Sequence, residues 1–139
     1  MFANLFSRKP SNETSEITAR QAMAAVMVRI AKSDDDYAVA ECERIDAVLS
    51  VLYDLTADQA MSLRLQAEAL EADAPDTVRF TRAIKEAVPY DDRFDVVRAL
   101  WQVVLADGER DHEEDALMRL LASLLGVNDR DSAIARQQA

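Results

Sequence analysis

Apolar residues recur at helical spacing along almost the whole chain of 139 residues. From about residue 16 onward they fall at i, i+3, i+4 and i+7, and no stretch alternates as a half-buried strand would. Alanine is abundant, whereas there are only 2 glycines and 3 prolines, a composition that favours helices. The pattern predicts an all-α fold, with one domain over residues 16–139 and a flexible lead-in over residues 1–15.

Breaks in this pattern divide the domain into seven predicted helices. Their expected ranges are 16–33, 37–53, 56–73, 76–87, 91–105 and 111–125, with a short last helix after residue 128. Thr56 and Gln59 have the spacing of a capping box, and Gly126 suits the left-handed residue that follows a helix. The helix over 91–105 carries the most apolar surface, so we expect it to be central. The predicted core faces are Met23, Val26, Met27 and Ile30; Ile45, Val48, Leu49 and Leu52; Leu63, Ala67 and Leu70; Phe94, Val97, Leu100, Trp101, Val104 and Leu105; and Leu117, Leu120, Leu121 and Leu124.

The chain also repeats itself. The segment IAKSDDDYAVAECERIDAVLSVLYDL resembles VVLADGERDHEEDALMRLLASLLGV when Asp34 is aligned with Asp107. Beyond the acidic loop, an offset of 72 residues keeps the apolar register and pairs Glu41 with Glu113, whereas an offset of 73 keeps the loops equal in length and pairs Glu41 with Glu114. Either alignment gives an apolar helix, an acidic loop and a second apolar helix in each half. We therefore expect two pseudo-repeated helical hairpins packed into one bundle.

The formal net charge of −10 is confined to these two loops. Residues 34–46 and residues 107–115 each hold six acids and one base, and the remaining chain holds 14 acids and 14 bases. Because affinity for nucleic acids comes mainly from Lys and Arg, we expect no nucleic-acid partner. The acidity instead indicates a local role for the two segments.

Two short motifs resemble a known family. They are A-D-G-x(5)-E over residues 106–114 and the degenerate S-D-D-x(5)-E over residues 33–41; with the apolar helices around them, they resemble the TerB-like proteins linked to tellurite resistance. The resemblance covers nearly everything from residue 16 onward. It implies a compact seven-helix domain with two acidic metal-binding motifs, and a part in a stress response, some of it at the membrane, without an agreed catalytic activity. Asp35 replaces the motif's glycine in the first copy, which favours the second loop as the site.

The residue types in the loops suit a hard cation. Ca²⁺ and Mg²⁺ take several oxygen ligands, largely carboxylates, that converge on one point, and a bound cation compensates the repulsion among neighbouring acids. Neither loop is an EF-hand, because its twelfth position is Met118 or Ile45 and its sixth is not glycine. We expect Ca²⁺ or Mg²⁺ as the cofactor. The predicted metal ligands are Asp107, Glu109, Asp111, Glu113 and Glu114 in the second loop and Asp34, Asp36 and Glu41 in the first.

A simpler interpretation stands beside this one. Acids gather at helix N-termini because they cap free amides and suit the helix dipole, and Asp111 with Glu114 is explained by capping alone. Capping does not require six acids at each helix start, so we favour metal binding. The alternative function is a metal-independent helical adaptor whose acidic patch binds a basic protein partner.

Other chemistry finds little support in the sequence. A single His112 and a single Cys42, in different repeats, do not form a nitrogen or sulfur metal site, and the acids that flank Cys42 disfavour its thiolate. No nucleophile with a base and no phosphate loop is present, so we expect no enzymatic activity.

The surroundings of the protein can also be predicted. A lone cysteine and the lack of a secretory segment indicate a cytoplasmic protein, and charge interrupts every apolar run too often for a transmembrane helix. Phe2, Leu5 and Phe6 with Arg8 and Lys9 suggest contact with an anionic membrane, but so short a segment binds weakly at best. We expect a protein partner, and the sequence does not define the oligomeric state.

Overall fold

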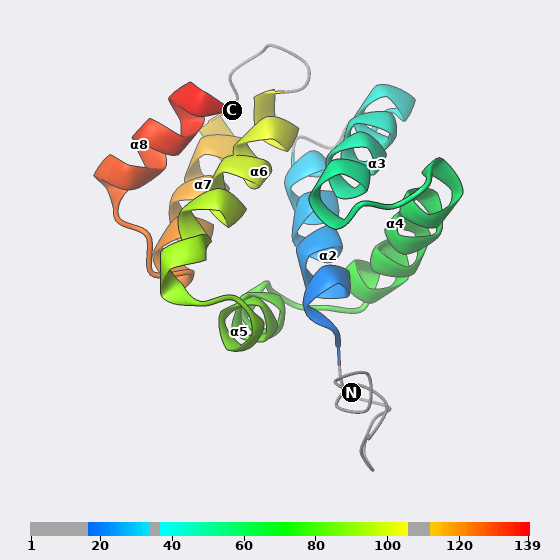
Figure 1. The fold of residues 1–139 in the computed structure, drawn as a ribbon, viewed down its shortest axis with the longest axis horizontal. Coiled ribbons are helices and arrows are strands. Elements are labelled where there is room, and N and C mark those ends of the chain that lie inside the picture. The colour runs from blue at the N-terminus through cyan, green and yellow to red at the C-terminus, as the bar shows by residue number, and fades with distance from the viewer. Residues whose placement is uncertain (1–16, 34–36, 106–111) are drawn as a thin grey trace.

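The structure, a computed structural model, describes residues 17–33, 37–105 and 112–139, apart from the side chains of residues 112–114. Within these residues the chain forms α-helices, a short 3₁₀ helix and no strand, which confirms the predicted all-α class of about seven helices (Figure 1). The predicted lead-in over residues 1–15 lies outside the described residues. In chain order the elements are α2 (Ala19–Ala31), α3 (Val39–Tyr53), α4 (Ala57–Ala72), α5 (Val78–Ala87), η2 (Tyr90–Asp92), α6 (Arg93–Val104), α7 (His112–Leu124) and α8 (Asp129–Gln138).

Local capping signals explain where several helices begin and end. The Thr56 hydroxyl accepts the backbone N–H of Gln59, and the Gln59 side chain accepts the N–H of Thr56, so the predicted capping box is confirmed. Thr18 and Gln21 form a second such box at the start of α2, which the sequence analysis did not predict. Gly126 follows α7 with φ 82°, in the left-handed region that glycine favours.

Helix α2 lies in the centre of the bundle, between α3 and α4 on one side and α6 on the other (Figure 1). Its predicted core face is buried, but so are Ala22, Ala24, Ala25 and Ala31. These small side chains let neighbouring helices approach α2 from almost every direction. The helix over 91–105 was expected to be central, and α6 is indeed well buried. Helix α2 shares the central position. The sequence did not predict this, because alanines contribute little to the apparent apolar surface of a helix.

The buried face of α7 differs from the predicted one. Leu120 was expected in the core but is 50% exposed, whereas Met118, Leu121, Ala122 and Leu125 are almost fully buried. These four residues also follow the i, i+3, i+4, i+7 spacing, so the helix is rotated toward a stripe that contains Met and Ala. Two apolar stripes of α7 have helical spacing in the sequence, and packing against the other helices determines which of them is buried.

This rotation decides between the two repeat alignments. With an offset of 73, the buried residues Ile45, Val48 and Leu49 of α3 correspond to Met118, Leu121 and Ala122, which are all buried. The ends of α2 and α6 and the starts of α3 and α7 obey the same offset, so the two connections are equal in length. The offset of 72 would pair buried Val48 with exposed Leu120. The structure therefore pairs Glu41 with Glu114.

Candidate functional site

The two acidic segments occupy equivalent places in the fold. The first, residues 34–46, runs from the connection between α2 and α3 into the first half of α3, and the second, residues 107–115, runs from the connection between α6 and α7 into the first turn of α7. In Figure 1 the C-terminal ends of α2 and α6 and the N-terminal end of α3 point toward the same end of the bundle, opposite to α5. The helices thus bring the flanks of both segments to one end of the molecule, although they are far apart in the sequence.

Most of the predicted metal ligands fall outside the part of the chain that the structure describes. Asp34, Asp36, Asp107, Glu109 and Asp111 belong to this group. Glu113 and Glu114 lie in the first turn of α7, which begins at His112, and their side chains are not described. Their place in the helix agrees with the predicted start of this element.

Glu41 is the one predicted ligand whose side chain is described. It lies in the first turn of α3, is 8% exposed, and its Oε1 accepts the backbone N–H of Ala38 at 2.8 Å. Ala38 has no side-chain oxygen to return the contact, so Glu41 supplies only half of a capping box. The hydrogen bond holds the Glu41 carboxylate beside the connection that precedes α3.

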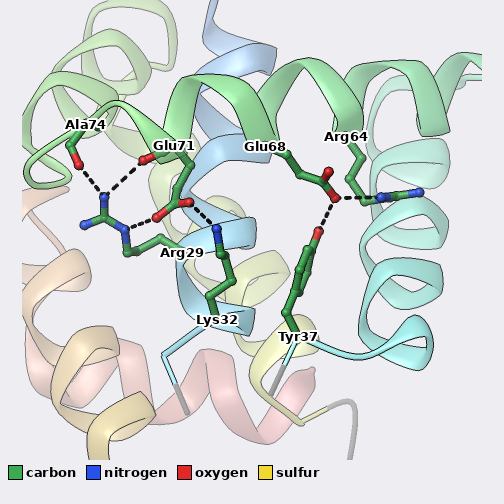
Figure 2. A network of polar contacts seen from close by, with 7 residues as sticks. All are labelled: Arg29, Lys32, Tyr37, Arg64, Glu68, Glu71 and Ala74. Atoms are coloured by element: carbon green, nitrogen blue, oxygen red, sulfur yellow. Dashed lines mark hydrogen bonds and ion pairs between the residues drawn. The ribbon is translucent and has the colours of Figure 1, made fainter. Parts of the chain in front are cut away.

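An ion-pair cluster centred on the buried Glu71 fixes the N-terminal flank of the first segment. Glu71 of α4 accepts from Arg29 Nε at 2.6 Å and from Lys32 Nζ at 3.0 Å, and Arg29 also donates to the carbonyl of Ala74 at 2.8 Å (Figure 2). Burial alone would raise the pKa of Glu71, but the hydrogen bonds from Lys32 and Arg29 outweigh it and lower that pKa. Lys32, the C-cap residue that follows α2, is thereby tied to the C-terminal half of α4.

The C-terminal flank of the segment is tied to the same helix one turn away. The Tyr37 hydroxyl donates to Glu68 Oε2 at 2.7 Å, and Arg64 Nη1 donates to the same oxygen at 2.7 Å (Figure 2). Arg64 also reaches Asp46 of α3 at 2.7 Å, which links α3 to α4. Burial and the hydrogen bond with Glu68 raise the pKa of Tyr37, so the phenol stays protonated and remains a donor. Lys32 and Tyr37, which lie on either side of residues 33–36, are therefore both anchored to α4.

One comparison with known proteins gives a match, and it covers these elements together. The family described as "Tellurite resistance protein TerB" matches residues 20–137. This range includes both hairpins, both acidic segments, and the α4 residues Glu68 and Glu71 that bind Tyr37 and Lys32. The chain belongs to the TerB family. No curated protein and no solved structure matches it. The resemblance drawn from the two acidic motifs is therefore confirmed at the level of the family.

In this TerB chain the described acids do not themselves form a metal centre. Among residues 17–33, 37–105 and 115–139, no group of three or more His, Cys, Asp or Glu side chains is placed to hold an ion. Glu68 and Glu71 are close to the first segment, but each accepts from cationic or hydroxyl donors. Most of the predicted cation ligands lie in the two acidic segments, outside the residues that this search covers.

The sequence analysis did not predict that Glu68 and Glu71 of α4 bind the flanks of the first segment. Glu71 lies four residues after Ala67 and eight after Leu63, so it occupies the apolar face of α4. An acid on a core-facing position needs a partner, and that was the available signal. Its partners Lys32 and Arg29 are 39 and 42 residues away in the sequence, and nothing local identifies them.

No described helix of this TerB chain is both long enough and apolar enough to cross a membrane. This agrees with the expectation that it has no transmembrane segment.

Proposed function

We propose that this TerB-family protein is a non-enzymatic domain that binds Ca²⁺ or Mg²⁺ at its acidic segments and acts as a scaffold or sensor in the response to tellurite, metal or chemical stress. One observation carries the proposal: two helical hairpins with connections of equal length bring the helix ends that flank both acidic segments to one end of the bundle, and these two segments carry the whole net charge of the sequence. Acids concentrated in this way repel one another, and a cation relieves that repulsion.

The donor set of each segment fits a hard cation. Asp107, Glu109 and Asp111, with Glu113 or Glu114 at the helix start, would supply the second site; Asp34, Asp36 and Glu41 would supply the first. All are carboxylates, the ligand type that Ca²⁺ and Mg²⁺ prefer, and a bound cation would add positive charge between them. The alignment of the buried residues of α3 and α7 pairs Glu41 with Glu114. It therefore favours Glu114 over Glu113 as the ligand from the first turn of α7.

The anchors on α4 suit a scaffold or a sensor. Lys32 and Tyr37 hold both ends of the first segment at fixed points, so less conformational freedom remains to be lost when its carboxylates converge. The same contacts connect this segment to α4, so a change in the segment would reach a helix whose outer face exposes Met61 and Leu65. A partner that contacts α4 would then respond to the cation.

Calorimetric titration with calcium and then with magnesium tests the proposal. Wild-type protein is expected to release or absorb saturable heat, and Asp107→Ala with Asp111→Ala is expected to remove most of it. Asp34→Ala with Asp36→Ala separates the contribution of the first segment.

The matched control is Glu86→Ala with Asp91→Ala, which removes two exposed acids near α5 at the opposite end of the bundle and should leave the heat unchanged. If the titration of wild-type protein gives no saturable heat, the metal proposal is overturned and the metal-independent adaptor is favoured. In that case, binding of the protein partner should persist when a chelator is present.

A further inference from the structure

A polar hollow lies between α6, α7 and α8, the three helices grouped on one side of Figure 1. Its volume is about 220 Å³, several times the roughly 30 Å³ that one water molecule occupies in the liquid. The polar and aromatic lining residues are Trp101, Asp115, Arg119, Asp129, Ser132 and Arg136. Neither the family match nor the proposed cation function assigns a role to it.

The floor of the hollow offers hydrogen-bond donors. Trp101 and Ser132 are each 7% exposed, and the indole N–H of Trp101 donates to Ser132 Oγ at 3.1 Å. Because Ser132 already accepts this bond, its own O–H is left to donate. The Arg136 guanidinium lies 5.3 Å from the centre of the Trp101 ring, a cation–π contact that fixes it over the indole.

Arg136 carries the most informative atom of the floor. Its Nε is buried and has no hydrogen-bond partner. An unsatisfied buried donor costs free energy, and the positive charge of this guanidinium has no anionic partner among the described side chains. The geometry of a guanidinium suits it to donate two parallel N–H hydrogen bonds to a planar carboxylate.

The rim adds both signs of charge. Arg119 projects from α7 and Asp129 from α8, and Asp115 lines the same hollow. Among the described side chains, no ion pair joins Arg119 or Arg136 to a carboxylate. The lining therefore holds two guanidinium groups and two carboxylates, so a ligand with only negative charge would also meet repulsion.

We propose that this hollow binds a small zwitterion of the amino-acid class. The ligand carboxylate accepts from Arg136 and Ser132 on the floor with Arg119 beside them, and the ligand ammonium group lies against Asp129 at the rim. This arrangement gives the Arg136 guanidinium the anionic partner that it lacks among the described side chains, and it matches both charges of the lining. The inference does not depend on the proposed cation function.

The single tryptophan of the chain reports directly on this hollow. The test follows Trp101 fluorescence and its indole N–H resonance in full-length protein with a chelator present, while L-alanine is added. Acetate and ethylammonium, each at the same ionic strength, supply the carboxylate alone and the ammonium group alone. A saturable change with L-alanine at concentrations where acetate and ethylammonium have little effect is the expected result.

Variants locate the binding to the proposed groups. Arg136→Gln is expected to weaken L-alanine binding by about tenfold or more, since it removes charge-assisted hydrogen bonds. Arg119→Gln, on an exposed position that can tolerate substitution, gives a second measurement if Arg136→Gln does not fold. The control Arg130→Gln removes an exposed arginine of α8 outside the hollow and should bind as wild type does.

Two results would overturn the proposal. Equal responses to acetate and L-alanine would show a simple anion site in place of a zwitterion site. The absence of any saturable response in wild-type protein would show that the hollow holds only water.

Discussion

At the scale of single residues, Glu71 shows how the fold supports the candidate site. It is 7% exposed, lies on the apolar face of α4, and accepts from both Arg29 and Lys32. Its pKa is lowered, so the native state binds a proton at Glu71 less readily than the unfolded chain does. The stability that this produces is present at pH values above the pKa of Glu71 in the unfolded chain. It is lost as the pH falls through the lower pKa of Glu71 in the native state.

Replacement of Glu71 by glutamine should expose this dependence. At neutral pH we expect Glu71→Gln to lower the free energy of unfolding by about 2 kcal/mol, because two cations lose their shared partner. The difference from wild type should shrink as the pH falls below the ordinary glutamate value of 4.5. Urea unfolding at several pH values measures both effects. The control Glu86→Gln changes an exposed acid of α5 and should stay within about 0.5 kcal/mol of wild type.

At the scale of elements, the two hairpins share the length of their connections, and they differ by one residue in where the left-handed residue after the second helix falls. The connections from α2 to α3 and from α6 to α7 are equal in length, and the second helix of each hairpin is followed by a left-handed residue. This residue is Asp54 with φ 56° after α3 and Gly126 with φ 82° after α7. The glycine is the relaxed choice there and the aspartate is the strained one.

Opposite substitutions at these two residues should have opposite effects. Gly126→Ala is expected to lower stability by about 1 kcal/mol through its backbone conformation. Space is not the cause, because an added Cβ would meet Arg93 Nη1 at 3.6 Å and Tyr90 Cε1 at 3.7 Å, which are ordinary contacts. Asp54→Gly should raise stability by up to about 1 kcal/mol. Thermal unfolding of both variants checks this, and a stabilising Gly126→Ala would refute the assignment.

The elements show where sequence reasoning succeeds and where it stops. Helix ranges and caps such as Thr56 with Gln59 were predictable because their signals lie within one turn of the chain. The rotation of α7 was not, since the stripe of Leu117, Leu120, Leu121 and Leu124 and the stripe of Met118, Leu121, Ala122 and Leu125 both have helical spacing. Only packing against the other helices distinguishes them.

At the scale of the whole molecule, the bundle brings the helix ends that flank the two acidic segments to one end (Figure 1). Equivalent positions of the two segments are more than 70 residues apart in the sequence, and the described helix ends beside them point toward the same end. The candidate ligands could be read from the sequence because they cluster there. The α4 residues that anchor the first segment could not, because their contacts form only when α2, α3 and α4 pack together.

The most direct test of the central claim is an amide NMR titration of the wild-type protein with calcium. We expect saturable shifts at the residues that flank the segments, including Ser33, Tyr37, Leu105 and the first turn of α7, with α5 at the opposite end left unchanged. Chelator should reverse them. If saturating calcium and magnesium leave these amides unchanged, or if the shifts centre on α5, the acidic end of this TerB protein is not a cation site.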